Sequence, residues 1–188
     1  VFCTNIVHLH LPNNNLTPDN LKNITCFKNL KTLNLSCNKF GVLSKPIKLF
    51  GLKKLEVLLL TNSLSNDTFN AGKNMFPLSL KVLHVQNNGI KQIPAFLEEL
   101  TQLTELYLDS NWGLNLAHLP PYLIKLNLSY CGLTHKHFYG CQVPETLKIL
   151  DIFCNNIRYL DDIFVNTPNL TKLNIGYNQL DQIIKGSF

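Results

Sequence analysis

Aliphatic residues recur along the chain in an eleven-residue pattern, L-x-x-L-x-L-x-x-N-x-L, whose first copy runs from Ile6 to Leu16. Eight copies begin at positions 6, 30, 55, 80, 103, 123, 147 and 170, at intervals of 20 to 25 residues. All 24 slots at the first, fourth and sixth positions hold Leu, Ile or Val. Alternating apolar slots have the two-residue period of a strand, so each copy predicts one short strand followed by a returning arm.

The ninth position of the pattern is asparagine in six of the eight copies. A buried side-chain amide both donates and accepts hydrogen bonds, so stacked asparagines can satisfy backbone groups where each strand turns. Ser63 and Cys131 occupy this position in the other two copies, and Ser63 marks the third copy as irregular. The ninth positions therefore predict a polar ladder that runs from copy to copy.

The arms between the strands carry apolar residues of their own, such as Ile93, Phe96 and Leu100. Pro120 and Pro121 fall in the shortest interval, of 20 residues. Because proline interrupts helical hydrogen bonding, this arm is predicted to be extended rather than helical.

With these eight copies the chain resembles the leucine-rich repeat family over essentially its whole length. The resemblance implies an α/β repeat fold, a leucine-rich-repeat solenoid or horseshoe of about eight repeats, with a concave parallel β-sheet and variable arms on the convex side. Residues 1–188 are then a single domain. The cysteine-rich caps of extracellular members are missing and the last copy holds only 19 residues, so we expect a fragment of a longer array.

Composition and charge exclude several other classes of protein. The chain has 188 residues, 45% of them hydrophobic, which suffices for one core. Its net charge of +5 comes from scattered lysines and the single Arg158, so a nucleic-acid partner is not favoured. The longest aliphatic run, residues 57–60, is far short of the roughly 20 residues that span a bilayer, so we expect no membrane span in this chain.

Six sequons of the form N-x-S/T point to the secretory pathway. Chance placement of 24 asparagines and 20 serines and threonines would give two or three. The repeat itself explains two, in the sequence L-N-L-S, but not the other four. The excess favours a secreted or cell-surface protein. The candidate glycosylation sites are Asn15, Asn23, Asn34, Asn66, Asn127 and Asn169.

Six cysteines can form three disulfides in 15 different ways. The positions of the cysteines within the repeats favour some pairs but do not determine the full set. Cys3 and Cys26 lie at similar phases of adjacent copies, as do Cys131 and Cys154, so both pairs are disulfide candidates. For Cys131 the alternative is a buried thiol that fills a slot of the ladder.

Motifs that carry catalysis are missing from the sequence. It contains no nucleophile elbow, phosphate-binding glycine loop, zinc-ligand spacing or H-E-x-x-H helix, so neither an enzyme nor a cofactor is expected. Two H-x-H pairs, His8 with His10 and His135 with His137, could ligate a metal on one strand face. They have no further ligand in register, so ordinary surface histidines are favoured and no metal site is predicted.

The outward-facing slots of the central copies are rich in aromatic and charged residues. Exposed rings flanked by charges are typical of protein-binding hot spots. Tyr107 and Phe153 are the expected anchors. The alternative is a solvated sheet face without a ligand, and sugars at Asn34 or Asn127 would shield part of it. The candidate ligand-binding residues are His84, Glu105, Tyr107, Asp109, Tyr130, Asp151 and Phe153.

The irregular copies and the sequons make the chain resemble the ectodomain of a Toll-like receptor or a secreted innate-immune protein of that kind. The resemblance implies a non-catalytic extracellular recognition module for a protein or microbial ligand or a co-receptor, with receptor dimerisation as an option. It carries over no ligand-binding residue, because only the repeat itself matches. The alternatives are a cytoplasmic scaffold or enzyme inhibitor and a pathogen surface adhesin.

Overall fold

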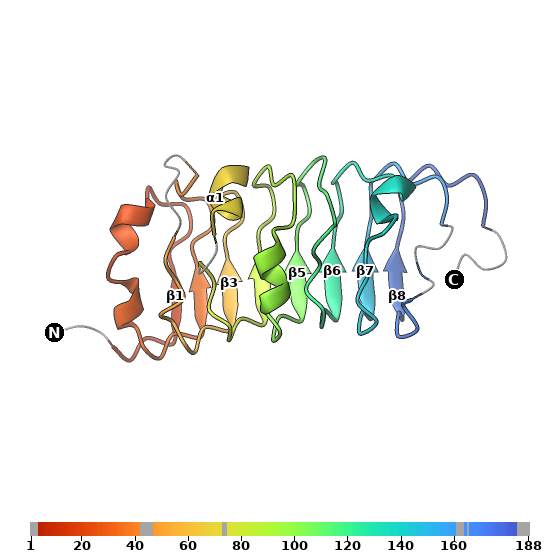
Figure 1. Ribbon diagram of the computed structural model, residues 1–188. Coiled ribbons are helices and arrows are strands. Elements are labelled where there is room, and N and C mark those ends of the chain that lie inside the picture. The colour runs from red at the N-terminus through yellow and green to blue at the C-terminus, as the bar shows by residue number, and fades with distance from the viewer. Residues whose placement is uncertain (1–3, 42–46, 73–74, 161–163, 165, 184–188) are drawn as a thin grey trace.

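Each copy of the pattern forms one three-residue strand, and the eight strands lie side by side in a single parallel sheet (Figure 1). This computed structural model describes residues 4–41, 47–72, 75–160, 164 and 166–183. The strands cross the sheet in chain order. They are β1 His8–His10, β2 Thr32–Asn34, β3 Val57–Leu59, β4 Val82–His84, β5 Glu105–Tyr107, β6 Lys125–Asn127, β7 Ile149–Asp151 and β8 Lys172–Asn174.

The pairing register follows the sequence pattern throughout the sheet. Leu9 pairs with Leu33 and Leu33 with Leu58, so fourth positions lie beside fourth positions. The same alignment continues through Leu150 and Leu173 at the other end. The leucine-rich-repeat solenoid with a parallel sheet that the sequence predicts is therefore confirmed.

The arms contain little regular structure. The one α-helix of the described residues, α1 (Asn66–Asn70), begins after Ser65, whose side chain accepts a hydrogen bond from Thr68 N. The part of the chain that the structure describes also has four short 3₁₀ helices, η1 (Pro18–Leu21), η2 (Ile24–Cys26), η3 (Ala95–Glu99) and η4 (His135–Phe138). The arm that contains Pro120 and Pro121 has no helix, as predicted. No helix of the described ranges is long and apolar enough to cross a membrane.

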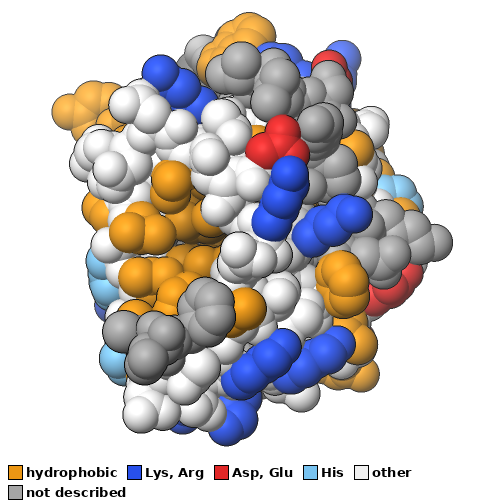
Figure 2. Space-filling model, turned by 90° about the vertical axis from the view of Figure 1, so that its left-hand side faces the viewer, with side chains coloured by type: hydrophobic (Ala, Val, Ile, Leu, Met, Phe, Trp, Pro, Cys, Tyr) orange, Lys and Arg blue, Asp and Glu red, His pale blue; other side chains and the backbone are white. Residues whose placement is uncertain are grey.

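The core lies between the sheet and the arms. In the six inner copies every first, fourth and sixth position is at most 1% exposed. The same positions of the first and last copies, such as Leu9 and Leu173, are only partly buried. A repeat contacts only its neighbours, so a terminal copy has one uncovered side. Figure 2 looks onto the β1 end, where apolar side chains and lysines both reach the surface.

The predicted ladder forms at the ninth positions. Asn111, which is fully buried, accepts hydrogen bonds from Asn88 N and Ile90 N at 3.0 Å each. Its amide donates to Val85 O at 3.0 Å and to Leu108 O at 2.7 Å. One side chain thus satisfies four backbone groups, two of them in the preceding turn and two at the ends of adjacent strands.

The eighth position of every copy adopts a left-handed backbone conformation, which the sequence analysis did not anticipate. The φ angles run from 51° at Asn62 to 63° at Ser110. Non-glycine residues adopt this conformation only when surrounding contacts hold it. Here the eighth-position N–H donates to the seventh-position carbonyl of the next copy, as from Tyr130 to Phe153 at 3.1 Å. The turn is thus fixed by the neighbouring repeat.

Cys131 occupies a ladder slot rather than a disulfide. Its thiol is fully buried, 3.4 Å from Leu108 O and 3.5 Å from Ser129 O, and burial raises its pKa to about 11. Ninth positions face the core whereas eighth positions, such as that of Cys154, face outward. The predicted Cys131–Cys154 disulfide is therefore not formed, and both are free thiols. Cys26 is also a free thiol. Its candidate partner Cys3 lies outside the described residues.

Candidate functional site

The outward-facing side chains of positions three, five, seven and eight make up a continuous surface, which we call the sheet face. On its fifth-position row Tyr107 pairs with Asn127, and Asn127 with Asp151. The alignment extends beyond the strands, because Ser110 N donates to Ser129 O at 2.9 Å. Seventh positions therefore line up as well. The sheet-face centre consists of Glu105, Tyr107, Asp109, Lys125, Asn127, Ser129, Tyr130, Asp151 and Phe153.

Tyr107 is enclosed between side chains of the two flanking strands. The His84 ring stacks on it from β4, with centroids 4.1 Å apart and planes 10° from parallel. From β6, Lys125 Nζ lies 4.9 Å from the Tyr107 ring centroid. The Tyr107 hydroxyl donates to Glu105 Oε2 at 2.7 Å. The Tyr107 side chain is thus held in place by its neighbours, and it is only partly exposed.

The packing of His84, Tyr107 and Lys125 shifts the pKa values of their side chains. Burial lowers the pKa of His84, and the Glu105 carboxylate only partly opposes this effect. Burial also raises the pKa of Tyr107, and contact with the Tyr107 hydroxyl raises the pKa of Lys125. At neutral pH the stack therefore holds a neutral histidine, a neutral tyrosine and a cationic lysine.

Asp109 and Asp151 are positioned by polar neighbours in the copy between them. Asn127 Nδ2 donates to Asp109 Oδ1 at 3.1 Å, and the Ser129 hydroxyl donates to Asp151 Oδ1 at 2.7 Å. Asp151 also accepts from Phe153 N at 3.0 Å and from Asn174 Nδ2 at 3.2 Å. Burial raises the pKa of Asp109, and the charge of Asp151 adds to the effect. Within the described ranges no lysine, arginine or histidine forms an ion pair with either aspartate.

Three aromatic rings form a ridge along one edge of the sheet face. Tyr130 meets Phe153 edge to face at 5.7 Å, and Phe153 contacts Tyr177 at 4.9 Å between centroids. Phe153 lies so close over Gly176 that a Cβ there would be 3.2 Å from its ring. Tyr130 is 51% and Tyr177 79% exposed, so the ridge offers large apolar area to a partner.

All seven predicted ligand-binding residues lie on the sheet face. His84, Glu105 and Tyr107 form the stack, the two aspartates flank Asn127 and Ser129, and Tyr130 and Phe153 lie on the ridge. Tyr177 was not among the predicted residues, although it occupies the eighth position as Tyr130 does. The positioning role of Ser129 was not predicted either, because nothing in the repeat distinguishes one seventh-position serine from another.

The six sequons differ in the surroundings of their side-chain amides. Asn15, Asn23 and Asn169 are exposed, whereas Asn34, Asn66 and Asn127 are partly buried. N-glycans attach to Nδ2, and the Nδ2 atoms of Asn127 and Asn169 donate to Asp109 and to Glu145 O. A glycan at Asn127 would therefore disrupt the sheet-face centre.

Neither histidine pair has the surroundings of a metal site. His8 Nδ1 lies 3.0 Å from Thr32 Oγ1, and His137 Nδ1 accepts a hydrogen bond from Thr134 N at 3.0 Å at the start of η4. Across the part of the chain that the structure describes, no three His, Cys, Asp or Glu residues gather in an arrangement that could hold a metal ion.

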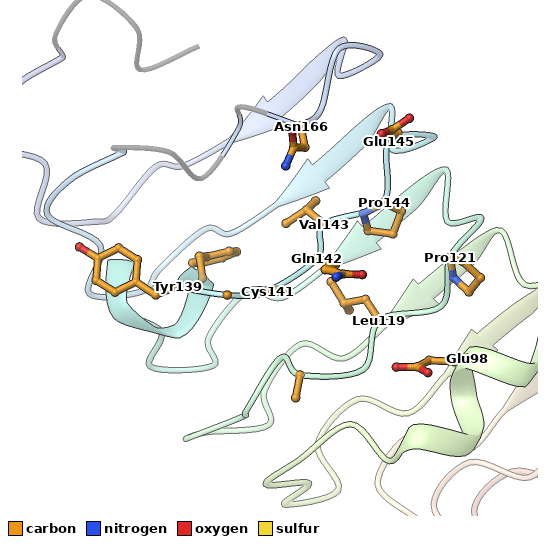
Figure 3. Close-up of a pocket in the computed structure, with 13 residues that line it drawn as sticks. Glu98, Leu119, Pro121, Tyr139, Cys141, Gln142, Val143, Pro144, Glu145 and Asn166 are labelled. Carbon is orange, nitrogen blue, oxygen red and sulfur yellow. The ribbon is translucent and has the colours of Figure 1, made fainter.

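A hollow of about 990 Å³ lies on the opposite, arm side of the solenoid (Figure 3). It opens between η3 and η4, where the 20-residue copy has a short extended arm through Leu119 and Pro121. Its lining is mixed, with apolar side chains, Tyr139 and the carboxylates of Glu98 and Glu145. Glu98 is already paired with His118 at 2.7 Å. The short interval in the sequence was the available signal for this hollow.

Comparison with known families and proteins agrees with the repeat fold. Residues 29–51 match the family described as Leucine Rich Repeat, and residues 143–159 match a second one of that description. Podocan-like protein 1 from Homo sapiens is 34% identical over 125 residues, 64% of this chain and 24% of that protein. Podocan from Mus musculus is 30% identical over 158 residues, 81% of this chain and 25% of that protein. The chain spans about a quarter of the length of these distant relatives.

Solved structures show the same fold. Internalin C2 from Listeria monocytogenes superposes with a TM-score of 0.67 at 24% identity, covering 95% of this chain and 74% of that one. The plant peptide hormone receptor RGFR1, solved in complex with RGF2, gives a TM-score of 0.56 at 20% identity, covering 93% of this chain and 29% of that one. At these identities the likeness concerns the solenoid fold.

Proposed function

We propose that this chain is a non-catalytic recognition module that binds a protein ligand at the sheet-face centre. The observation that carries the proposal is the concentration there of aromatic and charged side chains that neighbouring copies hold in place. Binding hot spots favour aromatic rings and arginine, and a ring or carboxylate that its neighbours already hold in place loses little further conformational freedom on association. Among the described residues that line the arm-side hollow, Glu98 pairs with His118, but they form no network of several side chains like that of the sheet-face centre.

A secreted or cell-surface location is part of the proposal. It is supported by the excess of sequons and by the exposure of Asn15 and Asn23. The finer assignment, to an ectodomain of the Toll-like receptor or secreted innate-immune kind, rests on the irregular repeats and the sequons. A microbial ligand, a co-receptor and receptor dimerisation belong to that finer assignment.

The cytoplasmic scaffold or inhibitor is the second candidate, and the free thiols of the five described cysteines favour it. Protein from a secretory host separates the two. We expect glycans on at least two of Asn15, Asn23, Asn66 and Asn169, seen as a mass loss on enzymatic deglycosylation, and none on Asn127. A polypeptide of bare mass would contradict the extracellular assignment.

The binding function is tested with an array of purified secreted and cell-surface ectodomains probed with the multimerised chain. For a partner found in this way, Tyr107→Ala combined with Phe153→Ala should weaken affinity by about 2 kcal/mol, roughly thirtyfold. The matched control is Lys172→Glu on β8, which should change affinity little. A partner insensitive to the double change but lost on Tyr139→Ala, in the arm-side hollow, would contradict the proposal.

A further inference from the structure

Two aspartates and two aromatic rings occupy opposite corners of the sheet-face centre. Tyr107 and Asp109 lie at the fifth and seventh positions of one copy, and Asp151 and Phe153 at the same positions two copies on. The carboxylates therefore lie on one diagonal and the rings on the other. The copy between them contributes Asn127 and Ser129, which are neutral and small.

The charges of this surface are unbalanced. Neither aspartate forms an ion pair within the described ranges. Lys125, which lies over the Tyr107 ring, interacts with Asp151 through its charge without forming an ion pair. Burial and Asp151 both raise the pKa of Asp109, so its charged form is disfavoured in the free protein. A cation brought by a partner would remove that penalty.

The two carboxylates are held in place and differ in free acceptor capacity, because Asp151 already accepts from Ser129, Phe153 N and Asn174. Asp109 accepts a side-chain hydrogen bond, through Oδ1, from Asn127, and a backbone hydrogen bond that opposes the rise of its pKa. An ionised carboxylate offers about four acceptor positions, so part of the capacity of Asp109 is free for a donor. Because the network already fixes the acceptors, a donor would find them without further ordering of the site.

The aromatic ridge selects among cationic side chains. Phe153 N donates to Asp151, so the partly buried Phe153 lies beside this carboxylate, and Tyr130, which is 51% exposed, packs edge to face against Phe153. A guanidinium can stack on a ring while its N–H groups reach a carboxylate, whereas an ammonium is a compact and strongly hydrated charge. Rings beside carboxylates therefore fit arginine better than lysine.

We infer that the sheet-face centre binds an arginine side chain of the partner, with the guanidinium on Asp109 and Asp151 and its flat face against Phe153. The inference rests on the proposed function and specifies the chemistry of the ligand. Local charge complementarity supports it, since Glu105, Asp109 and Asp151 outnumber Lys125 at the sheet-face centre, although the chain as a whole carries +5.

The test uses N-acetyl-arginine-N-methylamide as the probe and the uncharged citrulline analogue as its match. Titrations followed by backbone amide NMR should show arginine binding about tenfold tighter, with shifts centred on residues 107–110, 127–130 and 151–154. Asp109→Asn with Asp151→Asn should reduce the ratio to about one. The control, Glu98→Gln with Glu145→Gln, removes the same charge from the arm-side hollow and should keep it.

Equal binding of the two probes, no shift with either, or shifts that map to the hollow would each overturn the inference. The amide spectrum of each variant also reports whether it is folded. A partner that depends on Tyr107 and Phe153 but ignores the two aspartate changes would overturn the arginine site and leave the proposed function standing. A partner that needs neither pair would overturn the function itself.

Discussion

Side chains of the sheet face are fixed by residues in neighbouring copies as well as by residues of their own copy. Asp151 accepts hydrogen bonds from Ser129 in the preceding copy and from Asn174 in the following one. Tyr107 is likewise enclosed by His84 and Lys125. The sequence could place each residue on the correct face, because the strand period determines it. It could not predict which neighbours touch, because that depends on rotamers.

The Asp109 carboxylate should lower the free energy of unfolding at neutral pH. In the unfolded chain an aspartate ionises near 3.8, whereas burial raises the pKa of Asp109 in the folded protein. Between these values the folded state keeps a proton that the unfolded state has released, so the free energy of unfolding falls as pH rises through the window. Asp109→Asn, which keeps the acceptor for Asn127, should therefore be more stable than the wild type at pH 7.

Urea denaturation of both proteins at pH 7 and pH 3 measures this difference. The advantage of the Asn variant should disappear at the lower pH, where the aspartate is protonated in both states. A variant less stable than the wild type at pH 7 would mean that the Asp109 carboxylate is stabilising in the folded protein.

The repeated element consists of a strand, a left-handed eighth position and a ladder residue. The sequence predicted the strands and the ladder because their residues recur in phase across eight copies. The left-handed conformation was not predicted from the sequence, because the eighth position is not reserved for glycine and holds Asn, Ser, Cys or Tyr. The Cys131–Cys154 prediction failed because proximity in repeat phase does not fix the direction of a side chain.

A ladder residue at the centre of the solenoid should contribute more to the free energy of unfolding than a ladder residue at its end. Asn111→Ala leaves four buried backbone groups without their partner and should cost about 3 kcal/mol in urea denaturation. Asn111→Cys, which imitates Cys131, should cost less. Asn14→Ala is the control, because Asn14 is exposed and should cost under about 0.5 kcal/mol. Equal losses at the two asparagines would contradict the ladder.

The core leucines permit a matched comparison between inner and terminal copies. Leu106→Ala and Leu126→Ala should each cost about 2 to 5 kcal/mol, because the removed atoms leave a cavity in a closed core. Leu173→Ala, at the same slot of the last copy, should cost less because this side chain is only partly buried. A loss under about 0.5 kcal/mol at either inner site, in reversible denaturation, would show that the assigned register is wrong.

The molecule has two surfaces that are candidates for the binding site, the sheet face and the arm-side hollow. The sheet face was predictable, because the pattern itself separates inward from outward positions. The arm-side hollow was not, because arms vary in sequence and only the 20-residue interval marked the place. The hollow arises where one copy lacks the bulk of its neighbours, and a one-dimensional pattern does not reveal the resulting shape.

Four exposed tyrosines provide the most direct test of the sheet face as the binding surface. Tyr130 and Tyr177 lie on the aromatic ridge and are 51% and 79% exposed. Tyr139 lines the arm-side hollow at 64%, and Tyr122, at 53%, follows Pro121 of that hollow in the chain. Their similar exposure makes them matched reporters of hydroxyl-radical oxidation in the free chain. With a partner bound, Tyr130 and Tyr177 should be protected from oxidation several-fold while Tyr122 and Tyr139 react as before. Protection of Tyr122 and Tyr139 with unchanged oxidation of the ridge would contradict the account.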